Sequence, residues 1–248
     1  MNLKNAISVI TSPKRLSNSI NYRLKNKKVN RLYQDAIKNN PETFQQIRKV
    51  LEHFHGGGGY VRQFQDFKVF SLYQILNEYK PKVSIEFGSG VSTYAFSKYA
   101  TENPGVKHTT VEESEKWMAH TKGLIQGIGI DPEKVNWVHG EKVIDQSGEL
   151  TEIHVKQEFP QAFDLVFVDG PTLKINNVQN SEYINTDIFR ICEHNYPKVI
   201  VVDIRMYTVK QIQKRIGHLY HCEESHLFEI LKKDVRDKFN YYTVFIRK

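Results

Sequence analysis

The stretch KVSIEFGSGVSTYAFSKY, residues 82–99, decides the fold. Apolar residues alternate with smaller or polar ones over residues 83–87, which is typical of a strand. Pro81 prevents a helix from entering this strand from upstream. The small residues 88–90 predict a tight turn, and from Val91 onward apolar residues recur three and four positions apart, which predicts a helix.

A strand, a glycine turn and a helix start together predict a site for a nucleotide-like ligand. Gly88 and Gly90 carry no side chain that would hold a ligand away from the backbone, and the first helical turn offers unpaired N–H groups. A dinucleotide fingerprint needs a third glycine where this chain has Thr93. Glu86, at the strand end, would oppose a pyrophosphate but would suit a cationic ammonium or sulfonium group.

The segment Glu86-Phe-Gly88-Ser-Gly90-Val-Ser92 resembles the first motif of the class I S-adenosylmethionine-dependent methyltransferases, E/D-x-G-x-G. The resemblance implies a Rossmann-like fold and that S-adenosylmethionine is held by Glu86, Gly88, Ser89, Gly90 and Ser92. A glycine turn of this kind also occurs in unrelated α/β proteins.

Residues 106–112 predict a second strand that ends in two carboxylates, Glu112 and Glu113. An acidic residue at this strand tip is placed to accept both ribose hydroxyl hydrogens. The resemblance points to Glu112 for that role and leaves Glu113 as a first-turn helix residue that favours the helix dipole. The alternative is that both are charges at a helix start.

The remaining strands alternate with helices and predict a doubly wound, mostly parallel seven-stranded sheet with an N-terminal helical extension. The later strands are expected at residues 135–139, 163–168, 198–202, 219–222 and 241–245, the last two antiparallel and separated by a short helix near 227–232. Residues 181–192 have helical spacing, whereas residues 151–156 fit an extra strand or a helical turn. By position in the family, Gly140 and Glu141 would contact the adenine ring.

The fourth and fifth strands end in Asp169 and Asp203. In the similar catechol-type O-methyltransferases, an aspartate after the fourth strand and an Asp-Asn pair after the fifth bind a divalent metal. Asp169 and Asp203 match, but Ile204 replaces the asparagine and cannot ligate, so the resemblance implies a Mg²⁺ site with two protein ligands. Otherwise Asp169 acts as general base or orients the acceptor, and Arg205 pairs with Asp203 or with an anionic substrate.

Composition and charge divide the chain into a basic arm (1–34), a helical cap or lid (35–80) and a cofactor-binding domain (81–248). The arm carries eight of the 35 basic residues and no acidic one, which leaves 27 basic and 28 acidic residues in the body. An arm of this kind suits peripheral contact with an anionic membrane surface, nucleic acid or a polyanionic glycan carrier, and the alternative is a solvated or partly helical extension. The nearly neutral body argues against nucleic acid as the main partner. No apolar run is long enough to span a membrane and no signal peptide is recognisable, so we expect a cytoplasmic protein.

Together these patterns predict an S-adenosylmethionine-dependent methyltransferase that methylates an oxygen of a sugar or small hydroxylated molecule. Two alternatives are a catalytically silent S-adenosylmethionine-binding partner subunit and an NAD-dependent oxidoreductase. A nucleic-acid methyltransferase would carry an N-P-P-Y-like motif after the fourth strand, which this sequence lacks. The sequence gives no expectation for the oligomeric state.

Overall fold

The computed structural model describes residues 27, 30–56, 65–180, 182–224 and 242–248. Most of the predicted basic arm, the glycines 57–59 and the short helix near 227–232 lie outside the described residues.

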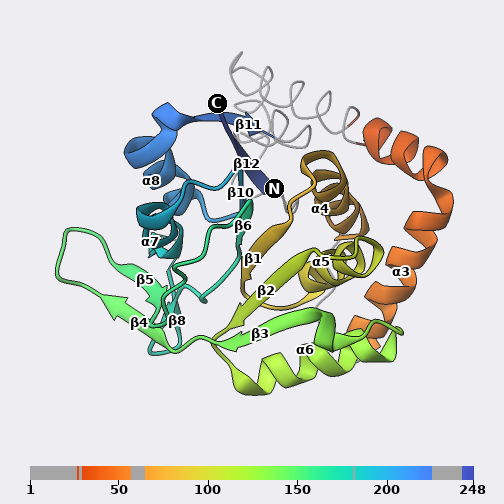
Figure 1. The fold of residues 1–248 in the computed structure, drawn as a ribbon, viewed down its shortest axis with the longest axis horizontal. Helices are drawn as coiled ribbons and strands as arrows, with labels where there is room; N and C mark the ends of the chain where they lie inside the picture. The colour runs from red at the N-terminus through yellow and green to blue at the C-terminus, as the bar shows by residue number, and fades with distance from the viewer. Residues whose placement is uncertain (1–26, 28–29, 57–64, 181, 225–241) are drawn as a thin grey trace, which may run out of the picture.

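A seven-stranded sheet forms the centre of the molecule (Figure 1). Its order is β11-β12-β10-β6-β1-β2-β3, parallel except where β12 pairs antiparallel with β10 and β11. The strands are β1 Val83–Phe87, β2 Lys107–Glu112, β3 Val135–His139, β6 Leu165–Val168, β10 Val199–Asp203, β11 Tyr220–Glu224 and β12 Tyr242–Arg247. The predicted doubly wound sheet and its antiparallel closing pair are confirmed.

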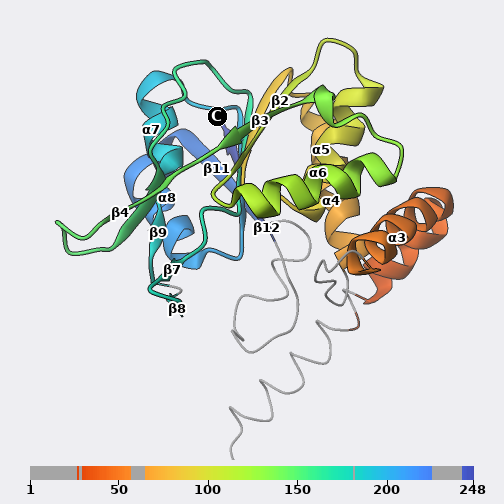
Figure 2. The ribbon, with the colours of Figure 1, turned by 90° about the horizontal axis from the view of Figure 1, so that it is seen from below.

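Helices cover both faces of the sheet, as the view in Figure 2 shows. One layer contains α4 Gln65–Tyr79, α5 Val91–Glu102 and α6 Glu115–Gly127, and the other contains α7 Asp187–His194 and α8 Met206–Ile216. Single 3-10 turns, η1 Pro132–Lys134 and η2 Gly217–Leu219, precede β3 and β11. Both faces of β6 and β10 are covered, which explains why their sequences are apolar without alternation. Two hydrophobic cores result, one under each layer.

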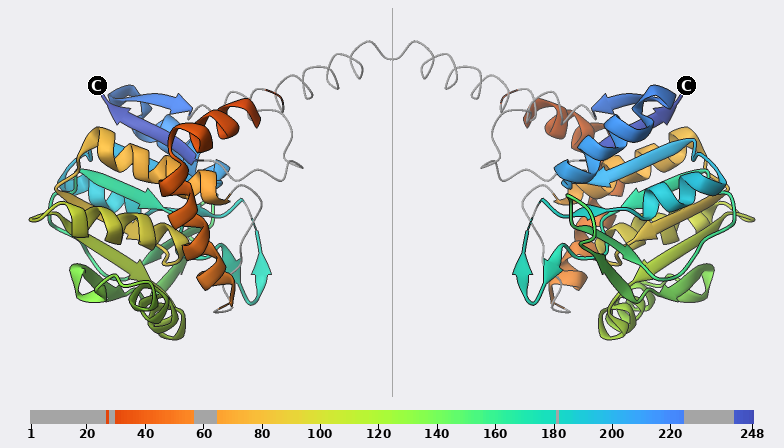
Figure 3. Two further views of the ribbon diagram at one scale, coloured as in Figure 1. Left: turned by 90° about the vertical axis from the view of Figure 1, so that its right-hand side faces the viewer. Right: turned by 90° about the vertical axis from the view of Figure 1, so that its left-hand side faces the viewer.

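The N-terminal extension is helical where it is described, over residues 30–39 and in α3 Pro41–Gly56. Figure 3 shows α3 on the outside of the α4 and α5 layer. Phe44 of α3 packs on Phe70 of α4 with ring centroids 4.7 Å apart, and Asp66 accepts hydrogen bonds from Tyr33 Oη at 2.7 Å and Arg48 Nε at 2.9 Å. The extension therefore joins the core beneath α4.

Small accessory strands surround the carboxyl edge of the main sheet. β4 Lys142–Asp145, β5 Glu152–Val155 and β9 Ile184–Asn185 form one sheet, and β7 Lys174–Ile175 pairs with β8 Val178–Gln179. The strand alternative for residues 151–156 is therefore correct. The helix expected from residue 181 is wrong in its first part, because Asn185 is held in β9 by hydrogen bonds from its N to Thr208 Oγ1 and from its Nδ2 to the Pro171 carbonyl, both 3.0 Å. In the described part of the chain, no helix is both long and apolar enough to cross a bilayer.

Candidate functional site

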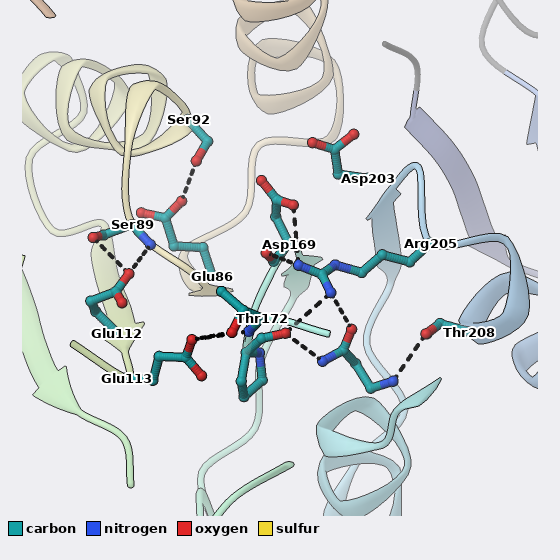
Figure 4. Close-up of polar contacts among 12 residues, drawn as sticks. Glu86, Ser89, Ser92, Glu112, Glu113, Asp169, Thr172, Asp203, Arg205 and Thr208 are labelled. Atoms are coloured by element: carbon teal, nitrogen blue, oxygen red, sulfur yellow. Dashed lines mark hydrogen bonds and ion pairs between the residues drawn. The ribbon is translucent and has the colours of Figure 1, made fainter. Parts of the chain in front are cut away.

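The candidate site lies at the carboxyl edge of the parallel strands, where the chain order reverses between β1 and β6. The chain runs from β1 outward through β2 to β3 and then returns to build β6 and β10 on the other side. Open α/β sheets bind ligands at such a switch point. Acidic side chains from four strand ends and the loop 88–90 are brought together here (Figure 4).

The turn after β1 packs directly on the turn after β6. A Cβ added to Gly88, whose φ is +91°, would lie 2.9 Å from the Asp169 carbonyl oxygen, and one added to Gly170 would lie 2.5 Å from the Gly88 nitrogen. Thr93, at the position of the third glycine of a dinucleotide motif, accepts a hydrogen bond from Gly90 N through its Oγ1 at 3.0 Å. Gly90 itself has open space where a Cβ would be.

Glu112 fixes this turn from β2. Its Oε2 accepts hydrogen bonds from Ser89 N at 2.8 Å and Ser89 Oγ at 2.9 Å, and its Oε1 accepts one from Ser114 N at 3.0 Å. Its neighbour Glu113 does not lie in the first helical turn as expected, because Ser114 is the N-cap and α6 begins at Glu115. Glu113 instead accepts a hydrogen bond from Thr172 Oγ1 at 2.5 Å, across the loop after β6.

A first cavity of about 310 Å³ opens between the turns after β1, β2 and β6. Of the predicted cofactor-binding residues, Gly88, Ser89, Glu112, Glu113 and Asp169 line it.

Glu86 is placed beneath the cavity rather than in it. Its carboxylate is fully buried and accepts hydrogen bonds from Ser92 Oγ and Thr110 Oγ1, both 2.8 Å. His108 and Ser84 complete a polar ladder between β1 and β2, with Ser84 Oγ 2.9 Å from His108 Nδ1. Glu86 therefore fastens the first turn of α5 to the sheet, and it lines neither cavity described here.

Gly140 and Glu141 line neither of the cavities described here. A Cβ on Gly140 would lie 2.7 Å from methyl groups of both Val111 and Val155, so this glycine serves close packing. Glu141 is exposed and pairs with Lys156 Nζ at 3.1 Å. Neither residue lines the first cavity, so the adenine contact expected from these two positions stays a prediction.

A second cavity of about 330 Å³ lies between α4, the start of α5 and the ends of β6 and β10. Ser89, Trp117 and Asp169 line both cavities. Trp117 is fixed by a hydrogen bond from its Nε1 to the Ser89 carbonyl at 2.9 Å. The predicted residues Gly90, Ser92 and Asp203 line the second cavity only.

Asp169 sits where the two cavities meet. Of its side-chain surface, 42% is exposed, and the residue lines both cavities. Burial in this cleft and the negative charge of Asp203 raise the pKa of Asp169 to about 7. The group can therefore gain or lose a proton near neutral pH.

Arg205 is turned toward Asp169 and not toward Asp203, contrary to the pairing expected from sequence. Its guanidinium donates to the Asp169 and Pro171 carbonyls and to Asn185 Oδ1, the last at 2.7 Å, and it lies 3.4 Å from Asp169 Oδ1. Asp203 forms its ion pair with Lys68 of α4 instead, and the Lys68 Nζ lies 2.5 Å from Asp203 Oδ2.

Lys68 and Trp117 are the site residues that sequence reasoning missed. Lys68 is separated from Asp203 by 135 positions and is one of several polar residues of α4, so no local signal identifies it. Trp117 could have been found, because a helix that starts after Glu113 places its first turn beside the turn after β1.

The site residues do not fit a Mg²⁺ ion. Mg²⁺ is bound by one or two free carboxylates with water, and here both available carboxylates, Asp169 and Asp203, already face basic side chains. The Lys68 ammonium already occupies one carboxylate oxygen of Asp203. Among the described residues, no group of three or more His, Cys, Asp or Glu side chains is arranged to hold a metal.

Comparison with known proteins shows the fold. No protein-family profile matches the chain, and no curated protein matches its sequence. The O-methyltransferase from Bacillus cereus, solved with S-adenosylhomocysteine, is similar in structure with a TM-score of 0.53 at 12% identity, over 82% of this chain and 91% of that one. TomG from Streptomyces achromogenes, an O-methyltransferase of tomaymycin synthesis solved with S-adenosylmethionine, gives 0.51 at 12%, over 82% and 90%. The S-adenosylhomocysteine-bound methyltransferase PaMTH1 from Podospora anserina gives 0.50 at 15%, over 90% and 96%. The chain therefore has the Rossmann-like methyltransferase fold.

Proposed function

We propose that the chain is an S-adenosylmethionine-dependent methyltransferase that methylates a hydroxyl group of a small molecule or a sugar. The observation that carries this proposal is the pair of cavities that meet at Ser89, Trp117 and Asp169. A transferase needs two binding spaces with a shared wall, one for the donor and one for the acceptor.

The first cavity suits the nucleoside part of the donor. Gly88 and Ser89 offer a compact backbone, and Glu112 at the tip of β2 lines this cavity, which supports a contact of its carboxylate with the ribose hydroxyls. Thr93 in place of a third glycine disfavours the NAD-dependent alternative, because its side chain closes the first turn of α5. When bound, S-adenosylmethionine supplies a methyl group on a positively charged sulfur that is already activated for displacement.

The second cavity suits the acceptor. A hydroxyl group placed against Asp169 can give its proton to that carboxylate while its oxygen forms the new bond to carbon. Arg205 holds the Asp169 main chain and side chain in position, so the carboxylate does not need to reorganise. Most of the work left to the protein is alignment of the acceptor oxygen.

Calorimetric titration with S-adenosylhomocysteine tests the proposal, using the full chain, Glu112→Ala and the control Glu115→Ala. Glu115 is 77% exposed and lines neither cavity. We expect Glu112→Ala to bind roughly tenfold or more weakly, since hydrogen bonds to a charged group are worth about 1.5–3 kcal/mol. Glu115→Ala should bind like the unchanged chain.

The outcome separates the alternatives. Binding of NADH without binding of S-adenosylhomocysteine would favour the oxidoreductase and overturn the proposal. Binding of S-adenosylhomocysteine without methyl transfer to any member of a panel of sugars and phenols would favour the silent partner subunit. Urea unfolding of each variant separates a loss of binding from a loss of fold.

A further inference from the structure

The second cavity contains an ion pair between two elements far apart in the chain. Lys68 comes from α4 and Asp203 from the end of β10, and their side chains are only 12% and 6% exposed. The Lys68 Nζ lies 2.5 Å from Asp203 Oδ2 and 4.9 Å from the centre of the Tyr242 ring, which holds the ammonium from a second direction. Asp203 Oδ1 is buried and has no hydrogen-bond partner among the residues that the structure describes.

The Lys68 ammonium is bound to one of the two strand-end carboxylates that a metal would need. Asp203 and Asp169 line the same cavity, and Lys68 lines it with them. The two carboxyl groups face two basic side chains, since Arg205 reaches Asp169 and Lys68 reaches Asp203. A divalent cation at the same carboxylates would add two further positive charges beside an ammonium that Asp203 and the Tyr242 ring hold in place.

We propose that the Lys68 ammonium takes the place of a divalent metal in this site and supplies the positive charge beside the acceptor oxygen. This inference rests on the proposed function. The acceptor hydroxyl donates its proton to Asp169 as its oxygen binds the methyl carbon, and Lys68 stabilises the negative charge that develops on that oxygen. The carbon–sulfur bond breaks with its electron pair on sulfur, so no metal is needed for charge balance.

A measurement of Mn²⁺ binding tests the inference without an acceptor. Electron paramagnetic resonance detects the bound ion, and the sample is full-length protein saturated with S-adenosylhomocysteine. The measured quantity is Asp203-dependent Mn²⁺ binding, that is, the part of the binding that is lost when Asp203→Asn is introduced. We expect none in the unchanged chain and none in Lys68→Arg, which keeps the positive charge. Lys68→Met should gain Mn²⁺ binding at ion concentrations at which the unchanged chain binds none, because the carboxylates lose the competing cation, and Lys68→Met with Asp203→Asn should not.

Lys198→Met is the matched control. Lys198 pairs with Asp164 at 3.0 Å at the opposite edge of the sheet and is 69% exposed, so its removal should leave Mn²⁺ binding unchanged. Asp203-dependent Mn²⁺ binding by the unchanged chain would overturn the inference, and this measurement needs no variant of Lys68. A folded Lys68→Met that still excludes Mn²⁺ would overturn it as well. Failure to bind S-adenosylhomocysteine would instead count against the proposed function.

Discussion

Replacing Gly170 by alanine tests how closely the two central turns must pack. The added Cβ would lie 2.5 Å from Gly88 N and 2.7 Å from both Gly88 Cα and the Phe87 carbonyl carbon, whereas ordinary contacts are 3.4–4 Å. All three neighbours are backbone atoms, so the turns must separate by roughly 1 Å. That movement strains the hydrogen bond from Asp169 N to the Phe87 carbonyl, which is 2.9 Å long.

The cost follows from these contacts. Overpacking a filled interior costs about 1–3 kcal/mol and a lost backbone hydrogen bond about 1 kcal/mol, so we expect the free energy of unfolding to fall by about 2–4 kcal/mol. For a chain of this length the Tm should fall by roughly 5–15 °C. Affinity for S-adenosylhomocysteine should fall too, because Gly88 and Asp169 line the first cavity.

Urea unfolding and calorimetry on the same preparations measure both effects. Gly148→Ala is the matched control, since no heavy atom lies within 4 Å of its added Cβ, and it should change stability by no more than about 0.5 kcal/mol. If Gly170→Ala unfolded at the same urea concentration as the unchanged chain and bound S-adenosylhomocysteine equally well, the close packing of these turns would contribute neither to stability nor to ligand affinity, and the prediction would be wrong.

Three further predictions use single side chains. Trp117→Phe loses the hydrogen bond to the Ser89 carbonyl and should bind S-adenosylhomocysteine about fivefold more weakly; it should also lose the ligand-dependent fluorescence change, which Trp137→Phe should retain. Burial raises the pKa of Asp187 to about 7, so the folded state keeps a proton that the unfolded chain releases near pH 4, and stability should fall as the pH rises from about 4 to 7. Urea unfolding at pH 5 and pH 8 should show this fall relative to Asp187→Asn, and an equal difference at both pH values would contradict it. Cys222 is exposed, whereas burial raises the pKa of the Cys192 thiol to about 12, so a thiol reagent should label one cysteine in native protein and the second only after unfolding.

The fold was predictable because its signals are local. The alternation in β1, the small residues after it and the helical spacing of α5 stand within 18 consecutive positions, and the apolar stretches of β6 and β10 identify central strands. Carboxylates directly after such strands must meet at one edge, so the grouping of Asp169 and Asp203 also followed from sequence.

Side-chain direction was harder to predict. A carboxylate at a strand end can face the ligand or the interior, and Glu86 faces inward because Ser92 and Thr110 offer it hydrogen-bond donors there. The polar pairs of Ser84 with His108 and of Glu86 with Thr110 on neighbouring strands were a signal for this ladder, but reading it requires the strand register. The contact of Lys68 with Asp203 depends on how α4 lies across the sheet.

The wall shared by the two cavities has an energetic consequence. Because Ser89, Trp117 and Asp169 line both spaces, a molecule that settles in one changes the surface offered to the other. Thermodynamic linkage then requires reciprocity. A molecule in the first cavity must change the affinity of the second cavity for its ligand by the same factor as that ligand changes the affinity of the first. Two molecules bound side by side in these cavities should accordingly change each other's affinity, and their coupling free energy depends on three shared residues.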